Sequence, residues 1–334
     1  MLTLGWKASA EQFAPADLLR NGVLAEELGF DSVVVSDHFH PWRDTGGHAP
    51  FSWAWLGALG AKTSRVRMGT SVVTPTFRYH PAIVAQAAAT IALLFPDRFF
   101  LGVGSGESMN ETPVLATEWP EPAERFRRLR EAVKLMKLLW SEDYVTFDGK
   151  YFKTRAAKIF DKPKNGVPLY IAAAGPQTAT YAGKEADGFI CTSGKGDELY
   201  RETLLPAVET GAREAGRDPA KIERTIEMKV SFDTDHNRAM ADTREWAALA
   251  LPAEDKAGVE DPREMERLAV QAEPYAHKRW LVSADPDEHV EQIKTYVDYG
   301  FDHLVFHFPG EDQEAAIARY GELILPRLRE QFGA

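Results

Sequence analysis

Eight short apolar segments, separated by longer segments with helical periodicity, most constrain the fold of this 334-residue chain. The segments are residues 2–7, 31–37, 65–73, 99–104, 168–173, 188–192, 224–231 and 303–308. They read as continuous apolar runs instead of alternating ones, as parallel strands covered by helices do. Eight such strands with helices between them predict an α/β fold, the (β/α)8 TIM barrel, with a doubly wound parallel sheet as the alternative.

The segments between the strands carry helical signals. Their apolar residues predict helices over 15–28, 81–95, 124–140, 176–185, 197–215, 286–299 and 312–332. Asp285 followed by Pro286 is typical of a helix start, with the Asp as N-cap. Gly29 and Gly300 each end a helix and are followed two residues later by an Asp that opens a strand.

Three segments exceed a bare barrel. Residues 38–52 form a long loop after the second strand, rich in His, Gly, Pro and aromatic residues. Residues 141–165 contain Asp148-Gly149, a hairpin signature, and residues 234–283 are a polar, helix-rich insertion before the last strand–helix unit. Because no linker or low-complexity stretch divides the chain, we expect one domain over 1–334.

Charge and cysteine content exclude several classes of function. The chain has 39 Lys and Arg against 50 Asp and Glu, a net charge of −11, which argues against nucleic acid or an anionic membrane as the main partner. Cys191 is the one cysteine, so an intrachain disulfide, a cysteine zinc site and an iron–sulfur cluster are excluded. The first residues lack the basic start and apolar run of a secretion signal, and we expect a cytoplasmic protein.

In a barrel, functional residues gather after the C-terminal ends of the strands. Asp37 and His38 follow the second predicted strand, and a carboxylate beside an imidazole can fix its tautomer. His38 and His40 have a spacing that allows two imidazoles to bind one metal, with His307 as a later candidate. The remaining ligands of a metal hydrolase are not evident, so we expect no metal.

The third and fourth strand ends carry small residues. Ser71 and Thr74 place hydroxyl groups where a ligand can meet them. Residues 102–110 are rich in glycine, which lets a flat or charged ligand approach the backbone, although they lack the dinucleotide-binding fingerprint. Glu107 is a candidate general acid or base at this rim.

The fifth and sixth strand ends suit an anion. Residues 172–178 form a small-residue turn that opens a helix, whose free N–H groups can bind a phosphate. Residues 191–196 resemble part of a P-loop without its full spacing, so a nucleoside triphosphatase is rejected. Thr192 and Lys195 still suit a phosphate, whereas Lys256 and Arg279, each taken alone, read as surface charges.

Five segments resemble the F420-dependent glucose-6-phosphate dehydrogenases of the bacterial luciferase-like superfamily. They are ASAEQF (8–13), SDHFHPWR (36–43), GHAPFS (47–52), GTSVVTPTFRY (69–79) and GFICTSGKG (188–196), and the likeness runs from about residue 4 to 332. The resemblance implies a luciferase-like barrel, a homodimer and the deazaflavin coenzyme F420. It also implies oxidation of the C1 hydroxyl of glucose 6-phosphate, or a related sugar 6-phosphate, to the lactone, with hydride transfer to C5 of the coenzyme.

The resemblance further implies roles for individual residues. His38 would act on the sugar hydroxyl and Glu107 on the coenzyme side, or the reverse, with Trp42 and Glu11 shaping the site. The coenzyme would be bound by Asp37, Ser71, Val72, Thr74, Ser105, Gly106, Asn110, Ala174, Gly175, Gln177 and Thr178. A non-proline cis peptide is expected at Ser71-Val72. The sugar phosphate would be bound by Thr192, Lys195, Lys256 and Arg279.

Two departures from the family pattern bear on the ligands. Ala174 stands where relatives carry Gly, and Ala257 stands where a relative has His. The second leaves fructose 6-phosphate and mannose 6-phosphate as alternative substrates. The competing functions are another F420- or FMN-dependent luciferase-like oxidoreductase acting on a non-sugar substrate, a metal hydrolase, and a coenzyme-binding protein without turnover.

Overall fold

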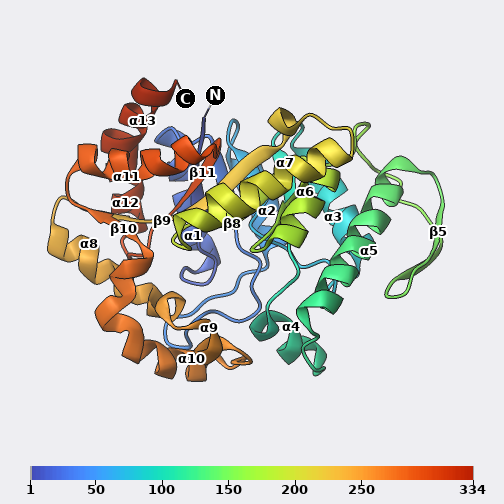
Figure 1. Ribbon diagram of the computed structural model, residues 1–334, viewed down its shortest axis with the longest axis horizontal. Helices are drawn as coiled ribbons and strands as arrows, with labels where there is room; N and C mark the ends of the chain where they lie inside the picture. The colour runs from blue at the N-terminus through green and yellow to red at the C-terminus, as the bar shows by residue number, and fades with distance from the viewer. Residues whose placement is uncertain (1, 334) are drawn as a thin grey trace.

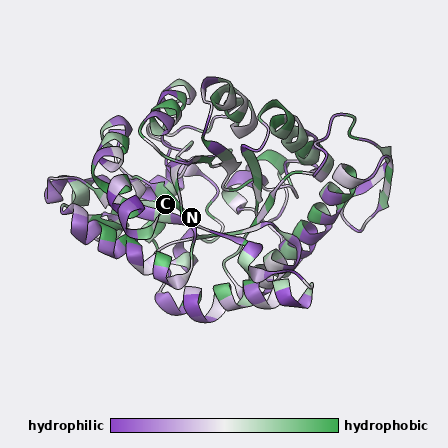
Figure 2. Cartoon of the chain, turned by 90° about the horizontal axis from the view of Figure 1, so that it is seen from above, coloured by the Kyte–Doolittle hydropathy of each residue, from purple (hydrophilic) through white to green (hydrophobic). Residues whose placement is uncertain are grey.

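Eight parallel strands close into a barrel that is surrounded by helices (Figures 1 and 2). The computed structural model describes residues 2–333, so the end residues 1 and 334 of the expected domain lie outside it. The barrel order is β11-β1-β2-β3-β4-β7-β8-β9, and β9 closes the ring by pairing with both β8 and β11. The predicted (β/α)8 barrel is therefore confirmed, and the doubly wound sheet is excluded.

The barrel strands fall within a few residues of the predicted ones. They are β1 (Thr3–Ala8), β2 (Ser32–Val35), β3 (Arg67–Thr70), β4 (Phe99–Val103), β7 (Leu169–Ala172), β8 (Gly188–Thr192), β9 (Glu223–Phe232) and β11 (His303–His307). The surrounding helices are α1 (Pro15–Glu27), α2 (Ser52–Lys62), α3 (Pro81–Leu94), α4 (Ser108–Leu115), α5 (Pro122–Ser141), α6 (Pro176–Glu185), η1 (Leu199–Leu204), α7 (Leu205–Glu214), α11 (Pro286–Tyr299), α12 (Gln313–Arg319), η5 (Tyr320–Ile324) and α13 (Leu325–Phe332). Sequence patterns predicted most of these helices, but not α2 or α4.

The repeated glycine–aspartate pattern has one structural role in both copies. Gly29 and Gly300 have φ of 93° and 106°, which ends α1 and α11 in the left-handed region that glycine adopts without steric cost. The Asp two residues later accepts a backbone hydrogen bond from a neighbouring strand. Asp31 accepts from the Leu4 N–H at 2.9 Å, and Asp302 accepts from the Arg224 N–H at 2.7 Å. The pattern therefore fixes each strand start against its neighbour.

Two of the three segments expected as insertions contain further helices and strands, and the third, residues 38–52, contains neither until Ser52 starts α2. Residues 141–165 contain the antiparallel hairpin of β5 (Val145–Asp148) and β6 (Lys153–Ala157), which projects beyond α5 (Figure 1). Residues 234–283 form α8 (His236–Asp242), η3 (Thr243–Ala250), α9 (Ala253–Lys256), α10 (Pro262–Ala269), η4 (Val270–Arg279) and β10 (Leu281–Ser283). The short helix η2 (Pro219–Lys221) lies before β9, outside this insertion. β10 pairs with the C-terminal end of β9, at Val230–Phe232. None of the helices within residues 2–333 is long and apolar enough to cross a membrane.

The interior of the barrel is layered. A polar layer at the N-terminal ends of the strands contains Arg67, Glu223 and His303, with Glu223 bound to both of the other side chains. Above it lies an apolar layer made of Val34, Phe100, Tyr170, Ile190 and Val305. The C-terminal ends of the strands form a third layer, which opens into a cavity.

Candidate active site

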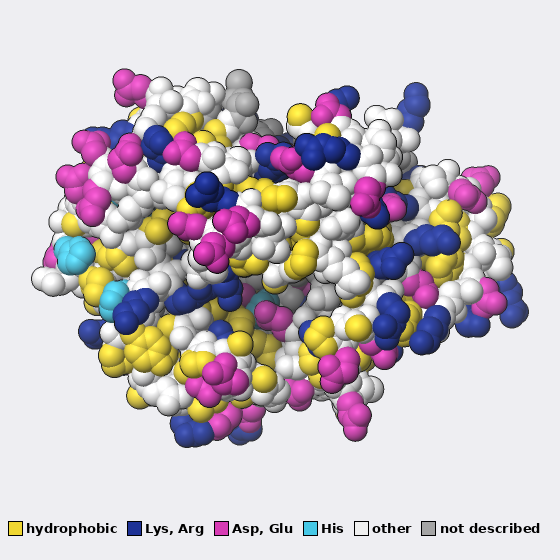
Figure 3. Space-filling model, in the orientation of Figure 1, with side chains coloured by type: hydrophobic (Ala, Val, Ile, Leu, Met, Phe, Trp, Pro, Cys, Tyr) yellow, Lys and Arg dark blue, Asp and Glu magenta, His cyan; other side chains and the backbone are white. Residues whose placement is uncertain are grey.

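A cavity of about 580 Å³ lies at the C-terminal ends of the barrel strands. That volume and position are usual for the active site of a TIM-barrel enzyme. On the face shown in Figure 3, the surface is hollowed near its centre, and basic side chains gather beside the hollow. The predicted site residues that line the cavity are Glu11, Asp37, His38, Trp42, Ser71, Val72, Thr74, Ser105, Gly106, Glu107, Asn110, Ala174, Thr192, Lys195, Lys256 and Arg279.

Three predicted coenzyme residues lie outside the cavity wall. Gly175, Gln177 and Thr178 follow the lining residue Ala174 and form the start of α6. Gly175 is the N-cap of α6 and has no side chain to bond the free N–H groups of the first turn. That helix end can therefore bind a ligand anion beyond the rim of the cavity.

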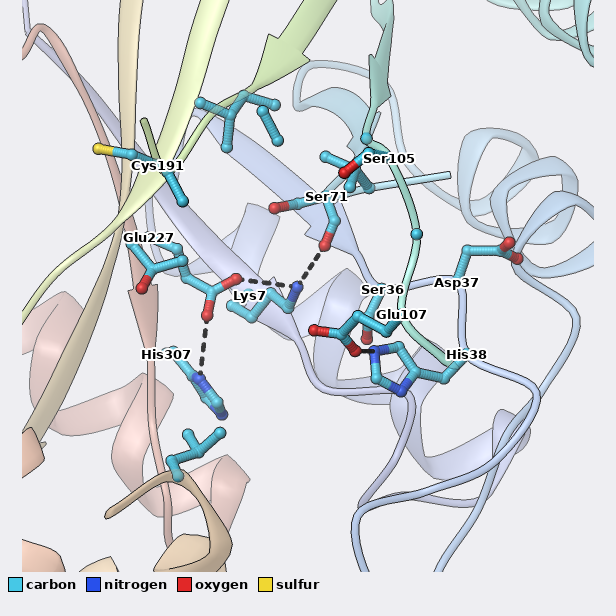
Figure 4. Close-up of a pocket in the computed structure, with 18 of the residues that line it drawn as sticks. Lys7, Ser36, Asp37, His38, Ser71, Ser105, Glu107, Cys191, Glu227 and His307 are labelled. Atoms are coloured by element: carbon cyan, nitrogen blue, oxygen red, sulfur yellow. Dashed lines mark hydrogen bonds and ion pairs between the residues drawn. The ribbon is translucent and has the colours of Figure 1, made fainter. Parts of the chain in front are cut away.

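His38 stands between a carbonyl group and two carboxylates, of which that of Glu107 is labelled beside it in Figure 4. Its Nδ1 lies 3.1 Å from the carbonyl oxygen of His40, and a carbonyl only accepts, so Nδ1 carries a proton. Its Nε2 lies 3.2 Å from Glu11 Oε1 and 3.9 Å from Glu107 Oε2. The Nε2 atom is therefore the one available for proton transfer in the cavity.

The two carboxylates beside His38 differ in environment. The Glu11 side chain is 5% exposed and accepts a hydrogen bond from the Ser36 hydroxyl at 2.5 Å. Burial favours a higher pKa for Glu11, but the charges of His38 and Lys7 and the Ser36 hydroxyl outweigh it and hold the pKa below its ordinary value. The Glu107 side chain is 53% exposed. Glu11 is thus a fixed negative charge, whereas Glu107 can exchange protons with solvent.

A buried network fixes the loop that carries His38. Arg78 binds Asp37 Oδ2 at 2.7 Å and Glu111 Oε1 at 3.2 Å, and the Ser52 hydroxyl donates to Asp37 Oδ1 at 2.6 Å. The Asn110 side-chain oxygen accepts from two backbone N–H groups of the loop, those of residues 39 and 40, at 2.8 and 3.2 Å. Two predicted coenzyme residues, Asp37 and Asn110, therefore also hold the loop of the candidate base.

Part of the cavity lining is built from small residues around the Ser71-Val72 peptide. The Ser71-Val72 peptide is cis, as the resemblance implied. A Cβ atom on Gly104 would lie 2.7 Å from Val72 Cγ2, and Gly106 has φ of 85°, so both positions suit glycine. Side chains at these two positions are therefore disfavoured beside Val72.

Three cations line the same cavity. Lys195, Lys256 and Arg279 come from the β8 end and from the insertion. Burial, together with the charge of Arg279, lowers the pKa of Lys195. Burial, followed by the charges of Lys195 and Arg279, lowers the pKa of Lys256. Cations that repel each other in a cavity form a site for a multiply charged anion.

Sequence analysis missed a second charged group in the cavity. Lys7, Glu227 and Lys229 line its floor, as does His307, which was considered only as a metal ligand. A Lys in an apolar first strand and a Glu-Met-Lys run in the seventh barrel strand were the available signals. Within residues 2–333, no three His, Cys, Asp or Glu side chains come together as a metal site would need.

Comparison with known proteins places the chain in a family. The family profile described as luciferase-like monooxygenase matches residues 3–303. The chain therefore belongs to the luciferase-like monooxygenase family. It groups there with relatives named F420-dependent glucose-6-phosphate dehydrogenase. The relative from Nakamurella multipartita is 58% identical over 99% of this chain and 98% of its own length. The relative from Beutenbergia cavernae is 60% identical over 98% of each chain.

Solved structures agree with this assignment. An F420-dependent secondary alcohol dehydrogenase, in complex with an F420–acetone adduct, superposes with a TM-score of 0.91 at 36% identity, covering 97% of this chain and 98% of that one. An F420-dependent tetrahydromethanopterin reductase from Methanopyrus kandleri shares the fold, with a TM-score of 0.80 at 21% identity over 98% of this chain and 99% of that one. The resemblance seen in the sequence motifs is confirmed.

Proposed function

We propose that this chain oxidises the C1 hydroxyl of glucose 6-phosphate, or of a related sugar 6-phosphate, to the lactone, with coenzyme F420 as hydride acceptor. One observation carries the proposal: a cluster of three cations shares a single cavity with a His38–carboxylate group. The cations suit the phosphate of the substrate, and the imidazole suits the hydroxyl at its other end. The names of the relatives at 58% and 60% identity support the same reaction.

The residues along the small-residue wall fit the coenzyme. The wall of Val72, Gly104 and Gly106 accommodates a planar ring, and the free N–H groups of α6 suit the coenzyme's phosphate. Asp37, Ser71, Thr74, Ser105 and Asn110 line the cavity around that wall, Ala174 lines its rim, and Gly175, Gln177 and Thr178 start α6. When bound there, F420 supplies C5 as the hydride acceptor.

The surroundings of His38 support its action as the general base on the sugar hydroxyl. In its neutral form, with the Nδ1 proton donated to a carbonyl, the His38 side chain presents the lone pair of Nε2 to the cavity. When Nε2 takes the hydroxyl proton, the imidazolium formed is stabilised by the carboxylate of Glu11, 3.2 Å away. Trp42, whose ring centroid lies 6.1 Å from that of His38, limits the space beside the imidazole.

Glu107 is then the residue that handles the proton on the coenzyme side of the reaction. Its carboxylate is within 3.9 Å of the same Nε2, yet its side chain is half exposed. Such a group can pass protons between the cavity and solvent without a large desolvation penalty. We assign the hydroxyl to His38 because only that residue has a buried countercharge for its protonated form.

The cations of the cavity form the proposed binding site for the substrate phosphate. Thr192 offers a hydroxyl beside Lys195 at the end of β8, and Lys256 and Arg279 are contributed by the insertion. Within residues 2–333, the main causes of the pKa shifts of Lys195 and Arg279 include no carboxylate, whereas Glu107 attracts Lys256. An excess of cations in one cavity of an acidic protein selects for an anionic substrate.

A turnover assay tests this function. Purified protein is mixed with oxidised F420 and with glucose 6-phosphate, fructose 6-phosphate, mannose 6-phosphate or unphosphorylated glucose, and the visible absorbance of the deazaflavin is followed. We expect bleaching with phosphorylated sugars only. Bleaching with a secondary alcohol but with no sugar phosphate would instead favour a non-sugar substrate. Tight F420 binding without any bleaching would leave a binding protein.

We also propose, from the family resemblance, that the protein is a homodimer, and from its sequence that it works in the cytoplasm. Light scattering of the purified protein tests the first, with twice the mass of the 37.2-kDa chain as the expected result. Cell fractionation tests the second.

A further inference from the structure

The barrel interior contains the same Glu–His pair twice. On β9, Glu223 and Glu227 are four residues apart, and on β11, His303 and His307 are four residues apart. Because side chains alternate along a strand, residues four apart point to the same face. Both pairs therefore point into the barrel, one at each end, with the apolar layer between them.

The lower pair has all its hydrogen bonds. His303 Nε2 lies 2.6 Å from the Ser32 hydroxyl, and His303 Nδ1 lies 2.6 Å from Glu223 Oε1. Glu223 also binds Arg67 at 3.0 Å. This end of a barrel is where residues serve stability. The lower pair thus shows what a complete structural Glu–His cluster looks like in this fold.

The upper pair is incomplete. His307 is 2% exposed, yet neither of its ring nitrogens makes a hydrogen bond. Its Nδ1 is 3.4 Å from Glu227 Oε1, a long contact of poor hydrogen-bond geometry, and the rings of Trp246 and Trp280 pack edge to face with the imidazole at centroid distances of 4.5 and 5.1 Å. A buried polar group without a partner is costly, so such groups in native proteins call for an explanation.

We call Lys7, Glu227, Lys229 and His307 the floor cluster. Its two lysines differ in how many hydrogen-bond partners they have. Lys7 Nζ lies 3.0 Å from Glu227 Oε2 and donates to the Ser71 carbonyl at 2.9 Å, so Lys7 is held between two acceptors (Figure 4). Among residues 2–333, Lys229 Nζ has only a long 3.5 Å contact with Glu227 Oε1, although the residue is 4% exposed. Two ammonium groups therefore share one carboxylate, and Lys229 keeps donors free.

The floor cluster lies between the two halves of the proposed active site. Lys7 is close enough to Glu11 to help lower its pKa. At the other side, the charge of Arg279 helps to lower the pKa of Lys229 after burial, and Lys229 acts likewise on Lys256. Lys229 and His307 line the same cavity as His38 and the phosphate cations, so a molecule that reaches from one to the other shares that cavity with them.

We propose that Lys229 and His307, with the Glu227 carboxylate between them, bind the ring hydroxyls that lie between the oxidised carbon and the phosphate, and so select among sugar 6-phosphates. The proposal rests on the sugar-phosphate dehydrogenase function above. A hydroxyl both donates and accepts, which suits a cluster that offers an ammonium group, an imidazole and a carboxylate. It also supplies the hydrogen bonds that His307 and Lys229 lack.

The test compares glucose 6-phosphate with its 2-deoxy, 3-deoxy and 4-deoxy analogues in wild type, Lys229→Met and His307→Phe. A site that bonds a substrate hydroxyl discriminates strongly against the analogue that lacks it. For charged partners we expect about 10- to 100-fold lower kcat/KM in wild type with at least one analogue. In the variants that ratio should fall to about threefold, with F420 affinity unchanged by fluorescence titration.

The lower pair provides the matched control. His303→Phe removes the corresponding imidazole from the structural cluster, so it should lower stability and leave the discrimination ratios as in wild type. If Lys229→Met or His307→Phe does not fold, Lys229→Gln and His307→Gln replace them, because both keep a polar group of similar length. Wild-type ratios in all the upper variants would overturn the proposal, as would a wild type that accepts every deoxy sugar equally. A wild type with no sugar-phosphate turnover would instead mark failure of the proposed function.

Discussion

Replacing Lys256 with Ala tests the phosphate site most directly. Lys256 Nζ has one weak protein contact, 3.5 Å to the Leu249 carbonyl, so removing it breaks little structure. Unit charges 4 Å apart interact by about 4 kcal/mol at an effective dielectric constant of 20, and the lost hydration of the phosphate offsets part of that. A charge-assisted hydrogen bond retains a net value of about 1.5–3 kcal/mol. The expected loss is therefore about 10- to 150-fold in kcat/KM.

Most of that loss should fall on KM, because the phosphate is bound equally in the ground state and the transition state. With unphosphorylated glucose, Lys256→Ala should behave like wild type. The matched control is Lys278→Ala, which removes the same charge from an exposed position that does not line the cavity. Steady-state kinetics at constant ionic strength compares wild type and the two variants with each of the two substrates.

The pH dependence of KM for glucose 6-phosphate gives a second test of the role of Lys256. Because burial and the neighbouring cations lower the pKa of Lys256, this lysine loses its proton at a lower pH than a solvated lysine does. KM for glucose 6-phosphate should thus rise on the alkaline side in wild type, and the rise should be smaller in Lys256→Ala. An equal loss of kcat and kcat/KM in Lys256→Ala, or the same loss with glucose, would refute the reasoning.

Three further predictions concern other parts of the molecule. His38→Ala should lower kcat by about 100-fold or more with F420 affinity largely kept, and full turnover by this variant in the same assay would remove His38 from the mechanism. Burial lowers the pKa of His289 to about 4, so the stability tied to its neutral form is present above pH 6.5 and is lost as the pH falls toward 4. In urea unfolding, His289→Gln should therefore flatten the decrease between pH 7 and 4, by up to about 3 kcal/mol, and an unchanged slope would contradict this. A Cβ on Gly211 would lie 1.9 Å from the Thr180 carbonyl oxygen, so Gly211→Ala should lower the free energy of unfolding by about 1–3 kcal/mol. In the control Gly57→Ala the nearest neighbour of the new Cβ is 4.0 Å away, so the free energy of unfolding should not fall. Equal urea unfolding midpoints for the two variants would refute the clash.

The sequence by itself determined the order and type of nearly all barrel elements, because short-range rules control them. Apolar runs gave the strands, and the N-cap of α11 formed as expected, with Asp285 Oδ1 accepting from two N–H groups at 2.9 Å. Helix α2 was missed because its apolar residues surround the helix instead of forming one stripe. Helix α4 was missed because it contains Pro113.

The motifs also placed most of the expected site residues around one cavity, since strand ends of a barrel share one edge. Lys256 and Arg279 were surface charges when taken singly, and only folding brings the insertion over the end of β8. No local rule relates the insertion to residues 192–195, which are separated from it by many residues along the chain.

Only the tertiary structure revealed the floor cluster. Lys7, Glu227 and Lys229 stand in strands, where a charged residue cannot be assigned to the barrel interior or to the helix layer from sequence alone. Strand register decides it, because a shift of one residue turns every side chain to the opposite face. The pairing of His307 with Lys229 and of His303 with Thr225 places both Glu–His pairs inside. Whether such a pair is complete depends on neighbours from other strands, and that difference separates the structural end of the barrel from its ligand-facing end.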